Sequence, residues 1–293
     1  MKKTLAPSQS ITTRDSKGQK FISVVEAAYN KAGLFEEEAQ RMNDAPGLSD
    51  LIHNFIAKNR LTDKFKDEEV KSSYGYLSGY KKPKGITEQT NILRQLFPGI
   101  GFANEELAQR PLPENSEVEG YFAIPRWESV AKTYGEAVQK VLDLINQTRN
   151  GKFCNRREGQ LGPRYLQQSE KAVKTFQKLG EEQKGYDILV VPAQFGIIHR
   201  GRSVRRAREV MRTSQFGLGA FAIGIMLLTH QERLQHYDDL WIDCAGDEFA
   251  PDADGDFRRA PYFRFSDSRV KFDSSFVGNP LESYGSASGF FPQ

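Results

Sequence analysis

The densest positive charge in the sequence lies at 200–212, where six arginines fall within 13 residues. They are Arg200, Arg202, Arg205, Arg206, Arg208 and Arg212. Guanidinium groups bind phosphate oxygens through paired hydrogen bonds, so this cluster could bind a nucleic-acid backbone. The alternative is pairing with the protein's own acids, eight of which lie at 238–256 without a Lys or Arg among them. The whole chain has 41 Lys+Arg and 38 Asp+Glu, and this near balance favours internal neutralisation.

The acidic segment suggests a second chemistry, because the alternating carboxylates of 252–256 resemble the opening of a calcium-binding loop. A complete EF-hand loop needs a Glu at its twelfth position, which is Phe263 here, so an EF-hand is excluded. A looser Ca²⁺ site would use Asp247, Asp252, Asp254 and Asp256. The alternative is an acidic turn in which these side chains cap backbone amides. Apart from this Ca²⁺ ion, no cofactor is expected.

Catalytic motifs are absent from the sequence. Cys154 and Cys244 belong to no CxxC pair, and the four histidines lack metal-ligand spacing. A metal-dependent hydrolase built on the acidic segment ranks last among the functions considered, because neither a nucleophile nor a general base accompanies it. We therefore expect a protein that is not an enzyme.

A third pattern occupies 257–284, where aromatic, Arg, Ser, Asp and Asn residues alternate with apolar ones. Tyr and Arg provide large contact areas, while Ser and Asn adapt their hydrogen bonds, a palette typical of binding loops. The candidate ligand-binding residues are Arg258, Arg259, Tyr262, Arg264, Ser266, Ser268, Ser274, Ser275, Phe276, Val277, Asn279, Leu281 and Ser283. The alternative is an ordinary hairpin whose core-facing residues are Phe263, Phe265, Val270 and Phe272.

The elements that position these residues follow from hydrophobic periodicity. Two strands are expected at 262–265 and 270–272 with a turn at 267–268, and further strands at 121–125 and 186–192. Helices are expected around 138–145 and around 173–179, and another begins near Ser203. Towards the N-terminus, Ser23 and Ser49 are expected to cap short amphipathic helices, and a third ends at Pro98. This order predicts an α+β fold.

Three regions are expected along the chain: a flexible lead-in at 1–20, a helical N-terminal region at 21–114 and a C-terminal domain at 115–293. The basic start is not followed by the apolar run of a signal peptide. The most apolar segment, at 216–228, has 13 residues and three glycines, too few to cross a bilayer. With only two cysteines, we expect a cytoplasmic protein that does not insert into membranes.

Four strings of this sequence resemble the variable proteins of diversity-generating retroelements, as found in candidate-phyla bacteria. They lie at 216–230, 239–248, 252–257 and 284–293, and the likeness covers roughly 70–293. The resemblance implies a C-type-lectin-like fold over 115–293, a variable ligand-binding surface at 257–284 and a fixed frame at 285–290. It also implies recognition without catalysis, since the paired cysteines of formylglycine-generating enzymes, which share the fold, have no counterpart in Cys154 and Cys244. The expected partner is an unidentified protein or other macromolecule, and nucleic acid is not expected.

Overall fold

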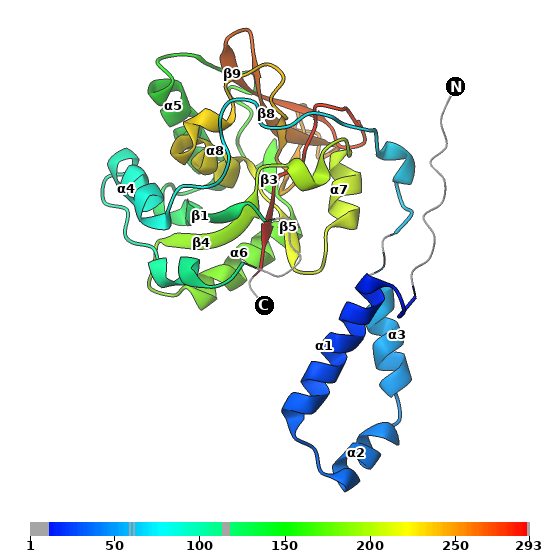
Figure 1. Ribbon diagram of the computed structural model, residues 1–293. Coiled ribbons are helices and arrows are strands. Elements are labelled where there is room, and N and C mark those ends of the chain that lie inside the picture. The colour runs from blue at the N-terminus through cyan, green and yellow to red at the C-terminus, as the bar shows by residue number, and fades with distance from the viewer. Residues whose placement is uncertain (1–11, 59, 61, 113–117, 292–293) are drawn as a thin grey trace. The chain divides into compact units, whose positions relative to one another are not determined.

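The structure is a computed structural model that describes residues 12–58, 60, 62–112 and 118–291 (Figure 1). It is a mixed α+β protein with two sheets, as the sequence predicted. The chain divides into two compact units, Met1–Arg60 and Leu61–Gln293. The expected boundary at 114/115 lies within 113–117, outside the described residues. Residues 62–112, expected to belong with the N-terminal helices, are instead part of the second unit.

Eight α-helices lie in the described part of the chain. They are α1 Ser16–Ala32, α2 Glu36–Asn43, α3 Leu48–Lys58, α4 Ile86–Leu96, α5 Tyr134–Thr148, α6 Glu170–Glu182, α7 Val204–Val210 and α8 Ala220–Thr229. The strands are β1 Gly120–Pro125, β2 Phe153–Asn155, β3 Leu166–Gln168, β4 Ile188–Gln194, β5 Gln215–Gly217, β6 Ile242–Asp243, β7 Asp247–Phe249, β8 Arg259–Ser266, β9 Arg269–Phe276 and β10 Ser288–Phe290.

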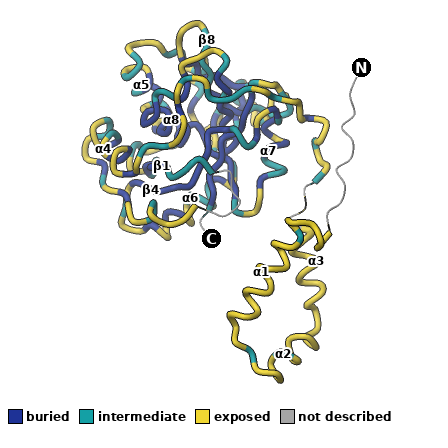
Figure 2. Tube along the Cα trace, viewed as in Figure 1, coloured by how far each residue is buried: buried dark blue, intermediate teal, exposed yellow. Residues whose placement is uncertain are grey.

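The first unit consists of α1, α2 and α3, and none of its described residues is buried (Figure 2). The lead-in expected at 1–20 is helical from Ser16, seven residues before the expected cap at Ser23. Residues 1–11 lie outside the described part of the chain. Helix α1 ends at Gly33, whose φ of 62° is the left-handed conformation that commonly terminates helices.

The second unit is built on two sheets. The first has the strand order β1-β4-β10-β5, and the second has the order β2-β9-β8-β7-β3, with β6 also paired to β8. All ten residues of α8 are buried, which explains the apolar run at 216–228. A Cβ at Gly224 of α8 would lie 2.4 Å from the Val141 side chain of α5. This segment is therefore a core helix.

Local sequence signals position the helices of the second unit. Thr133 and Glu136 form a capping box at the start of α5, whose predicted apolar stripe, Val138 to Ile145, is buried. Ser169 caps α6 by accepting a hydrogen bond from the Ala172 amide at 3.4 Å. Ser203 caps α7 in the same way, through the Arg206 amide at 3.1 Å, as the sequence predicted.

Two glutamine side chains complete the first sheet where a neighbouring strand is missing. Gln89 of α4 bonds both the Ala123 amide, at 2.9 Å, and the Tyr121 carbonyl, at 3.0 Å, on β1. Gln183, just after α6, bonds the Val190 amide and carbonyl of β4 at 2.8 and 3.1 Å. Each side chain thus satisfies one donor and one acceptor of a strand, as a paired strand would.

Close backbone packing explains the glycines beside the core. A Cβ built on Gly246 would lie 2.4 Å from the Gly217 carbonyl oxygen, and one on Gly217 would lie 2.4 Å from the Ala245 carbonyl carbon. Any larger residue at either position would have to move a backbone segment rather than a flexible side chain. These glycines therefore permit the strand β5 and the β6–β7 connection to touch.

Candidate functional site

The predicted binding residues are carried mainly by the hairpin of β8 and β9. Its turn at Asp267 and Ser268 has positive φ at both residues, 51° and 59°, a conformation that suits tight hairpins. Strand alternation places Phe263 and Phe272, which pair across the hairpin, in the core. The opposite face carries four of the predicted residues: Tyr262, Arg264, Ser266 and Ser275.

Solvent access divides the thirteen predicted residues. Eleven of them are exposed or half-buried, and Tyr262 and Ser274 are buried, at 6% exposure each. Arg259, Ser274 and Phe276 lie on the core side of the hairpin, where the Arg259 guanidinium stacks on Phe276 at 4.3 Å. Arg258, Val277, Asn279, Leu281 and Ser283 lie in the connecting segments, and Ser268 lies in the turn. The structure therefore does not gather all thirteen on one surface.

An aromatic stack organises the polar face of the hairpin. Trp241, directly before β6, stacks on Tyr262 with ring centroids 5.3 Å apart and an interplanar angle of 20°. Tyr284 lies 5.2 Å from the same tryptophan ring. The Arg264 guanidinium lies over Trp241 at 4.6 Å, a cation–π distance. We call Trp241, Tyr262, Arg264 and Tyr284 the Trp241 cluster.

Trp241 and Tyr284 were not among the predicted site residues. Trp241 is one of two tryptophans in the chain and lies two residues before Asp243, whose register partner is Tyr262. The period of two along a strand places 241, 243 and 262 on one face. That pattern, together with the prevalence of Trp and Tyr in binding hot spots, is the signal that could have found them.

Asp243 and Asp273, the two register partners of Tyr262, lie beside the cluster and differ in their hydrogen bonding. Burial raises the pKa of Asp243 to about 8, and its Oδ2 has no hydrogen-bond partner. Asp273 instead accepts from the Arg157 Nε at 2.8 Å and Nη2 at 2.5 Å. Burial also raises the pKa of Tyr262 to about 12, with the charge of Asp273 adding to the effect. At neutral pH the face therefore presents a mostly protonated Asp243 and a neutral Tyr262.

The segment before Trp241 is held by buried polar contacts. The Asp239 carboxylate accepts from the backbone amides of Leu77, Gln235 and His236 at 2.7–2.9 Å. The Arg233 side chain is fully buried, bonds the Leu240 carbonyl at 2.9 Å and stacks on Tyr76 at 3.8 Å.

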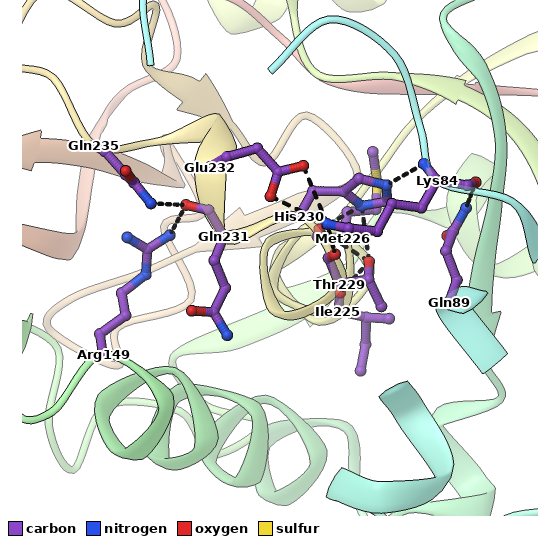
Figure 3. Close-up of polar contacts among 10 residues, drawn as sticks. All are labelled: Lys84, Gln89, Arg149, Ile225, Met226, Thr229, His230, Gln231, Glu232 and Gln235. Atoms are coloured by element: carbon purple, nitrogen blue, oxygen red, sulfur yellow. Dashed lines mark hydrogen bonds and ion pairs between the residues drawn. The ribbon is translucent and has the colours of Figure 1, made fainter. Parts of the chain in front are cut away.

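The end of α8, where this segment begins, has its own network (Figure 3). Lys84 Nζ bonds the Thr229 carbonyl at 2.7 Å and the Glu232 carboxylate at 3.1 Å, and the Lys84 amide donates to His230 Nε2 at 2.9 Å. Arg149, directly after α5, donates a hydrogen bond to the Gln231 carbonyl at 2.9 Å. Residues 229–241 are therefore tied to three other parts of the unit, and this fixes the position of Trp241.

Arg205 and Arg206 of the arginine cluster pair with acids outside the 238–256 segment that the sequence suggested. Arg205 pairs with Glu68, and Arg206 pairs with Glu69 at 2.5 Å. Arg208 Nε and Nη2 bond the carbonyls of Ala245 and Asp247 at 2.9 and 2.6 Å. The guanidinium groups that were candidates for phosphate binding thus anchor the 62–70 segment and the start of β7.

The four carboxylates proposed for Ca²⁺ do not converge. Asp247 is fully buried, and its oxygens accept from the Tyr134 hydroxyl at 2.8 Å and the Ala220 amide at 2.6 Å. Asp252 and Asp254 are exposed, and Asp256 pairs with Arg258 at 2.5 Å. Within the described residues, no group of three His, Cys, Asp or Glu side chains could hold a metal ion. These four side chains therefore do not form the Ca²⁺ site that the sequence suggested, because the Asp247 carboxylate is buried and bonded to Tyr134 and the start of α8.

A cavity of about 1260 Å³ lies between β1, α6 and the start of α8. Trp127, Val173, Phe176 and Phe221 provide its apolar lining. Arg126, at its edge, is already bound to the carbonyls of Tyr186 and Gly180. None of the predicted ligand-binding residues lines this cavity.

Among the described residues, no helix has the length and apolar character needed to cross a membrane. Comparison with family models, with curated proteins and with solved structures found no significant match to this chain.

Proposed function

We propose that this chain is a recognition protein that binds a macromolecular ligand through the hairpin of β8 and β9 and the following segment to Ser283. In this proposal it is a variable protein of a diversity-generating retroelement, with a C-type-lectin-like second unit whose surface residues are rewritten on a fixed scaffold. The observation that supports it is that the side chains before Tyr284 are mostly accessible to solvent, whereas those from Tyr284 to Phe290 are buried. Of the thirteen candidate residues, eleven reach solvent, whereas every residue from Tyr284 to Phe290 is buried.

The frame has the rigidity that such a role requires. Ser288 of β10 accepts hydrogen bonds from the side chains of Gln194, at 2.7 Å, and Gln215, at 2.8 Å. A Cβ on Gly285 would lie 2.7 Å from the Gly196 carbonyl oxygen. Because the frame is ordered before binding, little conformational entropy is lost when a ligand docks.

The Trp241 cluster is the proposed centre of the contact surface. It combines tryptophan, tyrosine and arginine, the residue types that dominate binding hot spots. Trp241 and Arg264 remain half-exposed, so both can contact a ligand. Tyr262 is buried and packs against the Trp241 ring.

Gene sequences test the proposal most directly. Sister copies within one genome should differ chiefly at 258, 259, 264, 268, 275, 277, 279 and 283, with 285–290 unchanged. A reverse-transcriptase gene and a near-copy of the last coding stretch should lie beside the gene. Substitutions distributed evenly along the chain would refute the retroelement assignment.

A library experiment tests the scaffold itself. Randomising Arg258, Arg264, Ser268, Ser275 and Asn279 together should leave most clones folded, as judged by soluble expression and cooperative melting. Randomising five positions within 285–290 should leave almost none folded. Equal losses in the two libraries would show that the surface is not a tolerant one.

A further inference from the structure

The first unit, taken by itself, has a large apolar surface that its described residues leave exposed. Twelve large hydrophobic side chains within Phe21–Ile56 are between 36% and 78% exposed. They are Phe21, Ile22, Val24, Val25, Tyr29, Phe35, Met42, Leu48, Leu51, Ile52, Phe55 and Ile56. Soluble proteins seldom expose a contiguous apolar surface of this kind unless it is an interaction site.

The apolar stripes are wider than the hairpin of α1 and α3 requires. At 100° per residue, the apolar residues of α1 span an arc of about 160°, and those of α3 about 140°. Within the unit the two helices meet at Phe21 and Phe55, whose ring centroids are 6.2 Å apart. Each helix therefore has apolar surface for a second helical neighbour that the described residues of the unit do not supply.

Charge is distributed unequally between the two ends of the hairpin. The open end, where α1 begins, carries Arg14, Lys17 and Lys20, with Asp15 as the exception. The closed end carries Glu36, Glu37 and Glu38 in the first turn of α2, with Arg41 the basic residue of its last turn. Helix α1 separates the ends by about 25 Å at 1.5 Å per residue.

We propose that two copies of this chain pair through residues 16–58 as an antiparallel four-helix bundle. A two-fold axis would bury the apolar stripes of both hairpins against each other. The antiparallel arrangement sets the basic end of one copy against the acidic end of its partner. A parallel pair would instead place like charges together at both ends. This inference does not depend on the proposed binding function.

The first experiment measures the mass of the full-length chain by light scattering over a concentration series. The expected result is a mass twice the 33.2 kDa of one chain. Leu51→Asp should weaken the dimer by about 100-fold, the loss typical of a hot-spot residue. Leu77→Asp is the matched control, because Leu77 is 59% exposed and belongs to the second unit, and it should leave the dimer intact.

A second experiment tests the orientation with variants that change only exposed charges. Replacing Glu36, Glu37 and Glu38 by Lys should weaken the dimer, most strongly at low salt. Adding Lys17→Glu and Lys20→Glu to that variant should restore it. Circular dichroism should show unchanged helix content in every variant.

A monomeric wild-type chain would overturn the proposal, as would a dimer that survives Leu51→Asp. In the monomeric case, slow hydrogen exchange in α1 and α3 would show that the stripes dock on the second unit. If the three Glu→Lys changes leave the dissociation constant of the dimer unchanged, the antiparallel arrangement is wrong.

Discussion

Residues 258–283 and 284–290 are neighbours in the chain but meet the solvent differently. Side chains of the first stretch alternate between the core and the solvent, and eleven of its thirteen candidate residues are exposed or half-buried. The second stretch is buried throughout and enters the first sheet as β10. The difference indicates that a substitution is tolerated where the side chain is exposed and not where it is buried. Tyr262 belongs to the first stretch, but it is buried like the residues of the second stretch.

The largest expected effect lies in the frame. Gly246→Ala should lower the free energy of unfolding by at least about 3 kcal/mol, because its Cβ would lie 2.4 Å from the Gly217 carbonyl oxygen. Gly162→Ala is the control, since its Cβ would meet nothing within 4 Å. Chemical denaturation of the two variants measures the difference, and equal stabilities would contradict the packing account.

The next effect separates Tyr262 from the other candidate residues. Tyr262→Ser should cost about 2 kcal/mol, because it removes a ring that packs against both Trp241 and Tyr284 and leaves a cavity. Tyr262→Phe, which keeps the ring, should retain most of the stability. If Tyr262→Ser melts like the wild type, Tyr262 belongs with the tolerant surface after all.

A pH series distinguishes the buried carboxyl groups from the surface ones. Asp243 has a folded-state pKa of about 8 and Asp247 one of about 7, against a usual value of 3.8. The folded state therefore holds these protons more tightly than the unfolded state. Their titration lowers the stability as pH rises, by up to about 1.4 kcal/mol per pH unit for each group. Below pH 6.5 the buried His199 and His230, whose pKa values burial lowers from 6.5 to about 3 and about 4, act in the opposite direction. The fall in stability is therefore expected between about pH 6.5 and 8.

Asp243→Asn should remove one of these contributions and lessen the fall between about pH 6.5 and 8. Urea denaturation at several pH values provides the measurement. Asp252→Asn, at an exposed position of the acidic segment, is the control and should keep the wild-type fall. A wild-type stability that rises between about pH 6.5 and 8 would contradict the assignment.

The smallest effects are expected at the exposed candidate positions. Asn279→Tyr and Leu281→Tyr should each change the free energy of unfolding by no more than about 0.5 kcal/mol, because both side chains are exposed. A loss of 2 kcal/mol or more at either position would mean that the candidate surface is part of the frame.

Local signals in the sequence predicted much of the second unit. The start of α7 near Ser203, the stripe of α5 and the turn at Asp267–Ser268 all depend on residues within a few positions of one another. The side chains packed against the candidate residues could not be predicted in the same way. Tyr262 is covered by Trp241 and Tyr284, which come from separate segments, and Arg205 pairs with Glu68, 137 residues away.

The calcium hypothesis failed for the same reason. The spacing of Asp252, Asp254 and Asp256 describes a turn, whereas the orientation of Asp247 is fixed by Tyr134 and the start of α8. The sequence also did not show that residues 62–112 pack with the second unit, because the contacts of α4 with β1 link positions about 30 residues apart.

The two glutamines that bond β1 and β4 have a consequence for how this protein behaves at high concentration. An unpaired strand edge is a template on which a second molecule can add its own strand, the first step towards fibrils. Gln89 occupies two such groups on the edge strand β1 from within the same chain, and Gln183 occupies Val190 of β4, beyond the stretch that β10 pairs with. The protection of the β1 edge therefore comes from outside 257–284, and it would persist however the residues of that segment were exchanged.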